Sequence, residues 1–244
     1  MRRLLSLILL VILSGSAHAS TPQINVGVLF DYLQPTHSNL LKRIRNTGDA
    51  TAYVRVEVTQ MHFDTDGRAS ETPVDTTALV RNRPDAQGVI ASPSRLIIAG
   101  KGQQATRLVY RGARDEERYY RLRFIPVAPS AEEFSLSEDQ AREVAELTSA
   151  IRVFTGYGTI FFVAPENPRY DTLIEQQQVR NRGNATVVLD NLRQCERDRP
   201  DSCTPGIIAH VRPGNSYALQ AAEHQFLRFD LREGDSQRSI DSRR

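Results

Sequence analysis

The stretch from Asn39 to Met61 is NLLKRIRNTGDATAYVRVEVTQM, and its alternation of apolar and polar residues determines the fold class. The alternation runs through NLLKRIRN and again through AYVRVEVTQM, which is the period-two pattern of a half-buried β-strand. Asn46-Thr47-Gly48 lies between the two runs and is a turn signal. We therefore predict two short strands separated by a turn.

The same pattern continues toward both ends of this stretch. It predicts further strands at residues 24–33, 94–100, 105–112 and 117–127. Short strands at regular spacing, with turn residues between them, are typical of a β-sandwich. Residues 137–148 differ, because Ser137 is a candidate N-cap with acidic residues behind it. There we predict a short helix or a mobile loop.

A second block of strands follows PENPRY, where Pro165 and Pro168 suit a hinge between domains. The pattern then predicts strands within residues 173–192, 207–219 and 224–233, and the polar tail from Gly234 is expected to fray. The prediction is an all-β chain of two sandwiches, with a signal peptide at 1–19, a first domain at 20–165 and a second at 166–244.

The first 20 residues have the parts of a secretory signal peptide: Arg2 and Arg3, an apolar core from Leu4 to Leu13, and a small-x-small cleavage site at Ala17-His18-Ala19. The alternative is a membrane anchor, but an apolar run of about 10 residues is short of the roughly 20 that span a bilayer. Cleavage would leave 29 basic residues of the 31, against 29 acidic ones. We expect export, no membrane insertion and no nucleic-acid partner.

The two cysteines, Cys195 and Cys203, predict a disulfide in an exported protein. The alternative is a metal or redox site, but the spacing is neither CxxC nor a zinc pattern. The other chemistry-bearing residues form no metal motif, nucleophile elbow or phosphate-binding loop. We therefore expect no metal, no cofactor and no enzymatic activity.

Residues 149–165, SAIRVFTGYGTIFFVAP, predict a long strand whose two halves differ. Beyond Gly156 the strand is almost wholly apolar from Ile160 to Val163, as expected where both of its faces are covered. The first half instead alternates.

Four segments of the chain together resemble the periplasmic pilus-assembly chaperones, the PapD-like family. They are SNLLKRIRNTGDATAYVRVEV, SPSRLIIAGKGQQATRLVYRG, ERYYRLRFIP and IRVFTGYGTIFFVAP. The stretches GNATVVLDNLRQC and VRPGNSY are similar to the family's second domain. Within the family, the chain is most similar to the alternate branch that serves common-pilus operons. The resemblance covers nearly all of the mature chain.

This resemblance implies two immunoglobulin-like sandwiches in an L-shaped (boomerang) arrangement. It also implies a function: the chaperone donates a strand to a pilin subunit that lacks one of its own, and delivers the subunit to an outer-membrane usher. An exposed donor strand could also let the free protein cap itself as a homodimer.

The period of two puts Ile151, Val153 and Thr155 on one face of the predicted strand, and these are the candidate donor residues. The alternative is that Ile151 and Val153 point into the chain's own core. A shift of one residue in register would exchange the two faces.

The family also holds the pilin's terminal carboxylate with a pair of basic residues between its domains, but this chain has Gly27 and Ile160 near those places. Lys42 is our candidate for this role, because it shares side-chain parity with Leu40 and Ile44 and should therefore point inward. A buried charge needs a partner, which the subunit's carboxylate would supply. Arg118 and Arg121 are further candidates for this subunit-carboxylate anchor; alternatively, they belong to an exposed strand face.

The sequence leaves two alternative functions. One is a structural or adhesive β-sandwich component of a pilus, and the other is a periplasmic enzyme. The segment beginning at Ile24 follows closely on the signal peptide, where a pilin would carry an alternating extension for donation, and this favours the chaperone.

Overall fold

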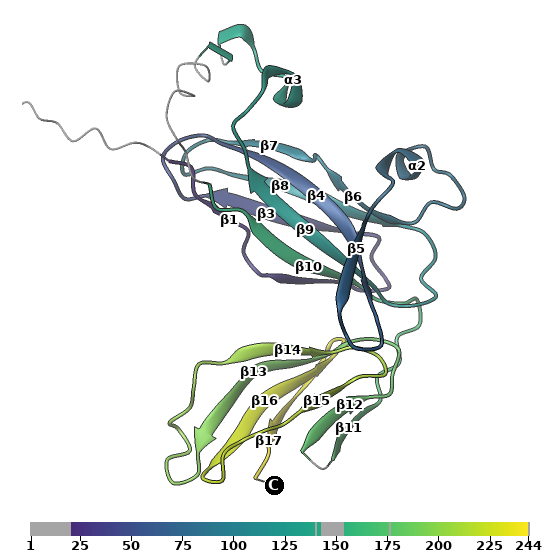
Figure 1. Cartoon of the computed structure of the whole chain (residues 1–244), viewed down its shortest axis with the longest axis vertical. Helices are drawn as coiled ribbons and strands as arrows, with labels where there is room; N and C mark the ends of the chain where they lie inside the picture. The colour runs from purple at the N-terminus through teal and green to yellow at the C-terminus, as the bar shows by residue number, and fades with distance from the viewer. Residues whose placement is uncertain (1–20, 140, 143–153, 176, 244) are drawn as a thin grey trace, which may run out of the picture.

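The computed structural model describes residues 21–139, 141–142, 154–175 and 177–243. The predicted signal peptide and residues 143–153 lie outside these ranges. In the described part, strands dominate and pair into four sheets, two formed by the strands up to Val163 and two by the strands after it (Figure 1). The predicted all-β class with two sandwiches is confirmed. None of the described helices is long and apolar enough to cross a membrane.

The first sandwich packs a four-stranded sheet against a six-stranded one. The four-stranded sheet has the order β1 (Ile24–Asn25), β3 (Asn39–Asn46), β8 (Gln103–Arg111) and β6 (Gly88–Ser92). The six-stranded sheet has the order β2 (Phe30–Leu33), β10 (Tyr157–Val163), β9 (Arg118–Pro126), β4 (Ala52–Phe63) and β5 (Ala69–Pro73), with β7 (Arg95–Ile98) also on β4. Two short helices, α2 (Thr76–Val80) and α3 (Ala131–Phe134), lie outside the sheets.

The second sandwich is smaller. One sheet has the order β11 (Thr172–Glu175), β12 (Gln178–Asn181) and β15 (Ser216–Ala218). The other has the order β14 (Ile207–Val211), β13 (Val187–Glu196), β16 (Gln225–Glu233) and β17 (Ser236–Asp241). Each sandwich has its own cluster of buried aliphatic and aromatic side chains, as expected where alternate residues of facing sheets interdigitate.

One asparagine corner recurs in both sandwiches. The buried amide of Asn46 donates to the carbonyl oxygens of Ala50 and Ile98, and its oxygen accepts from the backbone of Gly48. Asn181 makes the corresponding bonds in the second sandwich, and its oxygen accepts from Gly183. A Cβ on either glycine would lie about 2 Å from a backbone oxygen, so both Asn-x-Gly turns require glycine.

The predicted strand at residues 24–33 is two strands in different sheets. Ile24–Asn25 pairs with β3, whereas Phe30–Leu33 pairs with β10. Gly27 between them has a φ of 71°, which lets the chain turn from one sheet to the other. The uninterrupted apolar pattern concealed this crossing.

Three further predictions about elements need correction. The tail is not frayed, because Ser236–Asp241 pairs along β16 as β17. The strand before the Asn-Arg-Gly-Asn turn is a hairpin of β11 and β12, with Gln177 at a φ of 60°. The long strand at 149–165 begins as regular structure only at Tyr157 within the described part. In the predicted helix, residues 138, 139, 141 and 142 are helical, and the remainder is not described.

Candidate functional site

The candidate site is an edge of β10 along which described strands pair with only part of the strand. On one side, β10 pairs with β9 along its whole length, from Tyr157 to Val163. On the other side, β2 pairs with it in parallel only from Ile160 to Val163. The last bond of that ladder runs from the Ile160 N–H to the Leu29 carbonyl, at 2.8 Å. No described strand pairs with residues 157–159 on this side.

The backbone of Gly158 forms the open part of this edge. Alternate residues of a strand direct their N–H and C=O groups to the same side, so those of Gly158 face the same way as those of Ile160. Unpaired groups of this kind are a template for another strand. We call Tyr157–Thr159 the open edge; an added strand there would continue the line of β2.

A buried threonine lies in the same segment. Thr159 is fully buried, and its hydroxyl has no hydrogen-bond partner in the part of the chain that the structure describes. Buried hydroxyl groups in folded proteins are generally paired. The buried Thr159 hydroxyl beside the open edge is therefore an exception among the described residues.

The second half of β10 is firmly anchored on both faces, as the apolar run predicted. Phe161 lies in the core of the first sandwich. Phe162 points the other way and stacks on His210 of the second sandwich, with ring centroids 4.8 Å apart. The open edge therefore continues from a half-strand that is packed on both faces.

The candidate donor residues precede the open edge. Ile151 and Val153 lie outside the described residues, so their assignment stays a prediction. Thr155 is described; it is exposed and belongs to no strand.

Lys42 is buried and points inward, as its parity predicted, but its partner is within the chain. Its Nζ lies 2.6 Å from an Asp31 carboxylate oxygen and 2.6 Å from the Val28 carbonyl oxygen. The Asp31 pKa is raised because burial disfavours the carboxylate more than Lys42 favours it. The pair joins β3 to β2, and therefore joins the two sheets close to the open edge.

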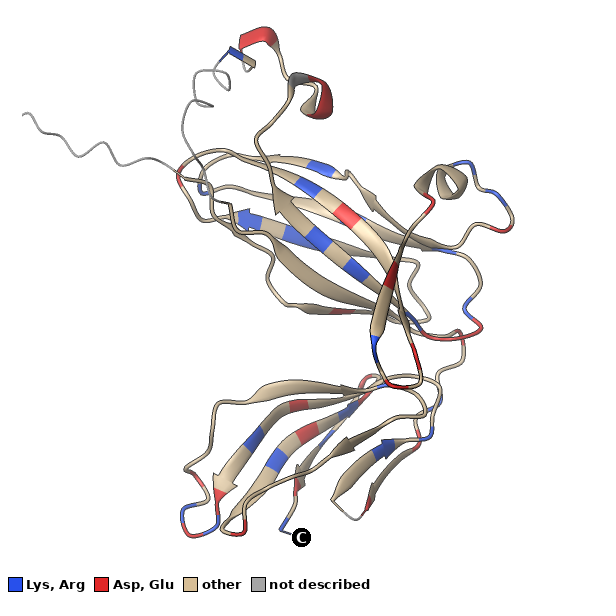
Figure 2. Cartoon of the chain, viewed as in Figure 1, with Lys and Arg blue, Asp and Glu red and all other residues tan. Residues whose placement is uncertain are grey.

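The other two anchor candidates do not come together with Lys42. Arg118 bonds to Asp115 and Arg121 lies 3.5 Å from Glu71. Three positions apart on β9, they project from opposite faces of the sheet. Figure 2 shows acidic and basic residues interspersed on β4, β5 and β9, so both arginines belong to locally paired strand faces.

The junction between the sandwiches contains contacts that the sequence did not indicate. The Glu117 carboxylate accepts hydrogen bonds from the backbone and hydroxyl of Thr186 and from the Tyr119 hydroxyl. Burial raises the pKa of Glu117 above its usual range. A single charged residue just before a strand carries no sequence signal of such a contact.

His210 forms the second part of the junction. Its Nε2 lies 2.6 Å from the Tyr32 hydroxyl, and its ring packs against Phe30 with centroids 4.4 Å apart. Burial, with Arg232 nearby, lowers the pKa of His210 to about 4. The ring is therefore neutral near pH 7.

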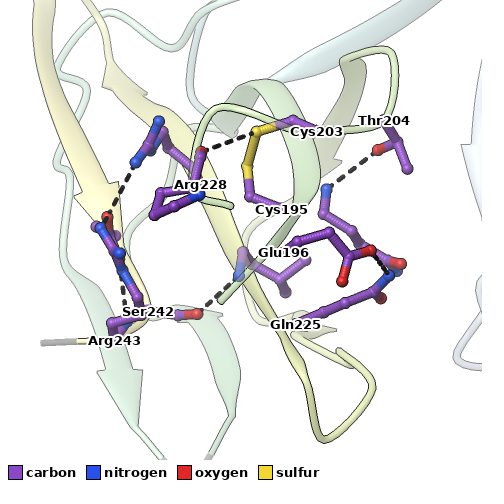
Figure 3. The surroundings of a disulfide bond; sticks show 12 residues. Cys195, Glu196, Cys203, Thr204, Gln225, Arg228, Ser242 and Arg243 are labelled. Atoms are coloured by element: carbon purple, nitrogen blue, oxygen red, sulfur yellow. Dashed lines mark hydrogen bonds and ion pairs between the residues drawn. A yellow bond between two sulfur atoms is a disulfide. The ribbon is translucent and has the colours of Figure 1, made fainter. Parts of the chain in front are cut away.

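The predicted disulfide between Cys195 and Cys203 is present (Figure 3). It ties the connection between β13 and β14 to the end of β13, where Cys195 also pairs with Phe226 of β16. Side-chain bonds from Gln225 to Glu196 and from the Gln194 N–H to Thr204 close the same region. The disulfide lies at the end of its sheet and has a structural role. No group of three or more metal-ligating side chains occurs in the described ranges.

The chain thus belongs to the class of two-sandwich proteins in which the sandwiches meet at a junction, and it has beside that junction a strand edge with which no described strand pairs. No family model matches the chain. It is 27% identical to the probable fimbrial chaperone EcpB of Escherichia coli O157:H7 over 182 residues, which cover 74% of this chain and 73% of the relative. It is 29% identical to the protein of the same name from Klebsiella pneumoniae subsp. pneumoniae over 178 residues, covering 72% and 71%.

The fold is similar to those of solved chaperones. The class 5 fimbriae chaperone CfaA matches with a TM-score of 0.54 at 15% identity, covering 90% of this chain and 99% of that one. The CupB2 chaperone of Pseudomonas aeruginosa matches with a TM-score of 0.51 at 12% identity, covering 89% and 98%. The resemblance to the pilus-assembly chaperones is therefore confirmed in sequence and in fold.

Proposed function

We propose that this protein is a periplasmic chaperone that binds fimbrial subunits by strand pairing at the open edge and delivers them to an outer-membrane usher. The open edge carries the proposal, because no described strand pairs with its backbone on the side of β2, where a subunit strand could be added. The relatives named as probable fimbrial chaperones support it. Strand exchange requires no bond-making chemistry, so the proposed function includes no catalytic step.

Ile151 and Val153 are the proposed donated side chains, with Thr155 next in the same alternation. They precede the open edge directly, and alternate residues of a strand project to one face. The proposed domains are residues 20–165, which carry this strand, and 166–244, after removal of the signal peptide at 1–19.

Lys42 is the proposed contact for the subunit's terminal carboxylate. It lies behind Val28, beside the place where an added strand would end. Because Asp31 occupies it in the free protein, a subunit carboxylate would have to replace Asp31 as its counter-ion. Arg118 and Arg121 have local acidic partners and are not proposed further.

The experiment is capture of a subunit by the mature protein in the periplasm. The tagged chain is co-expressed with a major fimbrial subunit from the same organism, and the complex is quantified by size-exclusion chromatography. We expect the Ile151→Asp/Val153→Asp double variant to lose the complex while keeping its melting temperature. Arg152→Asp is the matched control, since its side chain has the opposite parity, and it should retain the complex.

Two results would overturn the proposal. Equal complex formation by the double variant and the wild type would remove the donor assignment. Recovery of the chain in purified surface fibres, with no free subunit complex, would instead favour a structural or adhesive pilus component.

A further inference from the structure

The described part of the chain has six large hydrophobic residues that are exposed: Val28, Leu29, Leu41, Val80, Ile207 and Ile208. Val28 and Leu29 directly precede Phe30, which contacts the second sandwich. Ile208 lies two residues before His210, which makes the other half of that contact. We call Val28, Leu29 and Ile208 the apolar lip.

The directions of β2 and β14 place the lip on one side of the junction. From Phe30, β2 runs toward Leu33, which lies beside Glu117 and Thr186 in a common pocket. From His210, β14 runs toward Arg212, which stacks on Phe63 of the β4 hairpin at 3.6 Å and acts on Glu117 electrostatically. Both strands thus run toward the Glu117 contacts. Residues that precede Phe30 and His210 lie on the opposite side, away from the chain linking the sandwiches.

Ile208 projects from the second sandwich toward the first. Alternate residues of a strand share a face, so Ile208 has the direction of His210, whose ring packs on Phe30 and Phe162. Ile208 is nevertheless 45% exposed. Figure 1 shows that β14 is the strand along the side of the second sandwich that faces the first.

The lip is continuous with the open edge. The Leu29 carbonyl accepts the last bond from β10, at Ile160, so Val28 and Leu29 mark the point at which a strand added beside β10 must end. Such a strand continues the line of β2. Alternate side chains of β2, Phe30 and Tyr32, face the second sandwich, and the last outward side chain of an added strand faces it in the same way.

We infer that Ile208 of the second sandwich is part of the subunit-binding surface, and that the apolar lip receives an apolar side chain near the end of the added subunit strand. The inference rests on the proposed function. If so, the second sandwich contributes to the choice of subunit. A polar or charged residue of the subunit strand that contacts Ile208 would lose its water without gaining a hydrogen-bond partner, and such a subunit would bind less tightly.

The test uses the co-expression of chain and subunit described above, with variants at positions 208 and 80. Ile208→Asp is expected to reduce the complex at least about tenfold, the loss typical of a central apolar contact. Val80→Asp is the matched control, because Val80 is 68% exposed on α2, away from the junction, and should bind as the wild type does. Melting temperatures of both free variants test their folding.

Site-specific photo-crosslinking keeps the inference testable should Ile208→Asp fold poorly. A benzoylphenylalanine in place of Ile208 should crosslink to the strand end of the subunit, and the same group in place of Val80 should not. A folded Ile208→Asp variant with wild-type binding, or no crosslink from position 208 in an intact complex, overturns the inference and leaves the proposed function standing. Wild-type binding by Ile151→Asp/Val153→Asp, in contrast, overturns the proposed function.

Discussion

Replacement of Lys42 by methionine tests the buried link between the two sheets. Methionine has a similar length but no charge, so Asp31 would lose its counter-ion in a site where the Lys42 and Asp31 side chains are only 4% and 8% exposed. Leaving one partner of a buried ion pair costs about 3–5 kcal/mol. With a urea m-value of roughly 1.5 kcal/mol/M, the unfolding midpoint should fall by about 2–3 M.

The chain has no tryptophan, so unfolding is best followed by far-UV circular dichroism. The double variant Lys42→Met/Asp31→Leu should recover most of the loss, to within about 1.5 kcal/mol of the wild type, because an apolar pair can replace a buried ion pair. Arg68→Met is the control: its partner Asp66 is exposed, and no measurable change is expected. The reasoning is refuted if Lys42→Met is as stable as the wild type, or if the double variant is no better than the single one.

Three further predictions concern the junction, the disulfide and the tail. In the folded protein, the pKa of His210 is about 4, against an ordinary value of 6.5. Neutral His210 therefore contributes up to about 3 kcal/mol to the free energy of unfolding above pH 6.5, and this contribution is lost as the pH falls through 4. The melting temperatures at pH 7 and pH 4.5 should differ less in His210→Phe than in the wild type, and equal differences would contradict this. Cys195→Ala/Cys203→Ala should lower the unfolding free energy by about 2–3 kcal/mol, and dithiothreitol should have no effect on that variant. Deletion of residues 236–244 should lower the melting temperature of the second sandwich, since β17 pairs along β16; an unchanged melt would show that the tail is dispensable.

Period-two alternation predicted the strands whose two faces differ. NLLKRIRN is β3 from its first residue to its last, because one face meets the core and the other meets solvent. The alternation failed at Gly27, where a residue with positive φ redirects the chain without interrupting the apolar pattern. It also failed at Gln177, where the polar run EQQQ holds a hairpin turn inside a predicted single strand. It also failed for the polar tail, since β17 lies at a sheet edge and needs little apolar surface.

Only part of the candidate site could be predicted from the sequence. Side-chain parity correctly predicted that Lys42 points inward, and a buried charge was expected to need a partner. The sequence did not identify Asp31 as that partner, because the two residues lie on strands of different sheets. The contacts of Glu117 and His210 join residues that are far apart in the chain. Such pairings depend on how the two sandwiches meet, which no local pattern encodes.

Amide hydrogen exchange at Gly158 tests the central claim most directly. In the free protein, the Gly158 N–H faces the side of β10 on which no described strand pairs with it, and it should exchange faster than the Ile160 N–H, which bonds to Leu29. Binding of a fimbrial subunit should protect Gly158 to the level of Ile160. If Gly158 exchanges at its free rate in the isolated complex, the subunit does not pair with the open edge and the account is wrong.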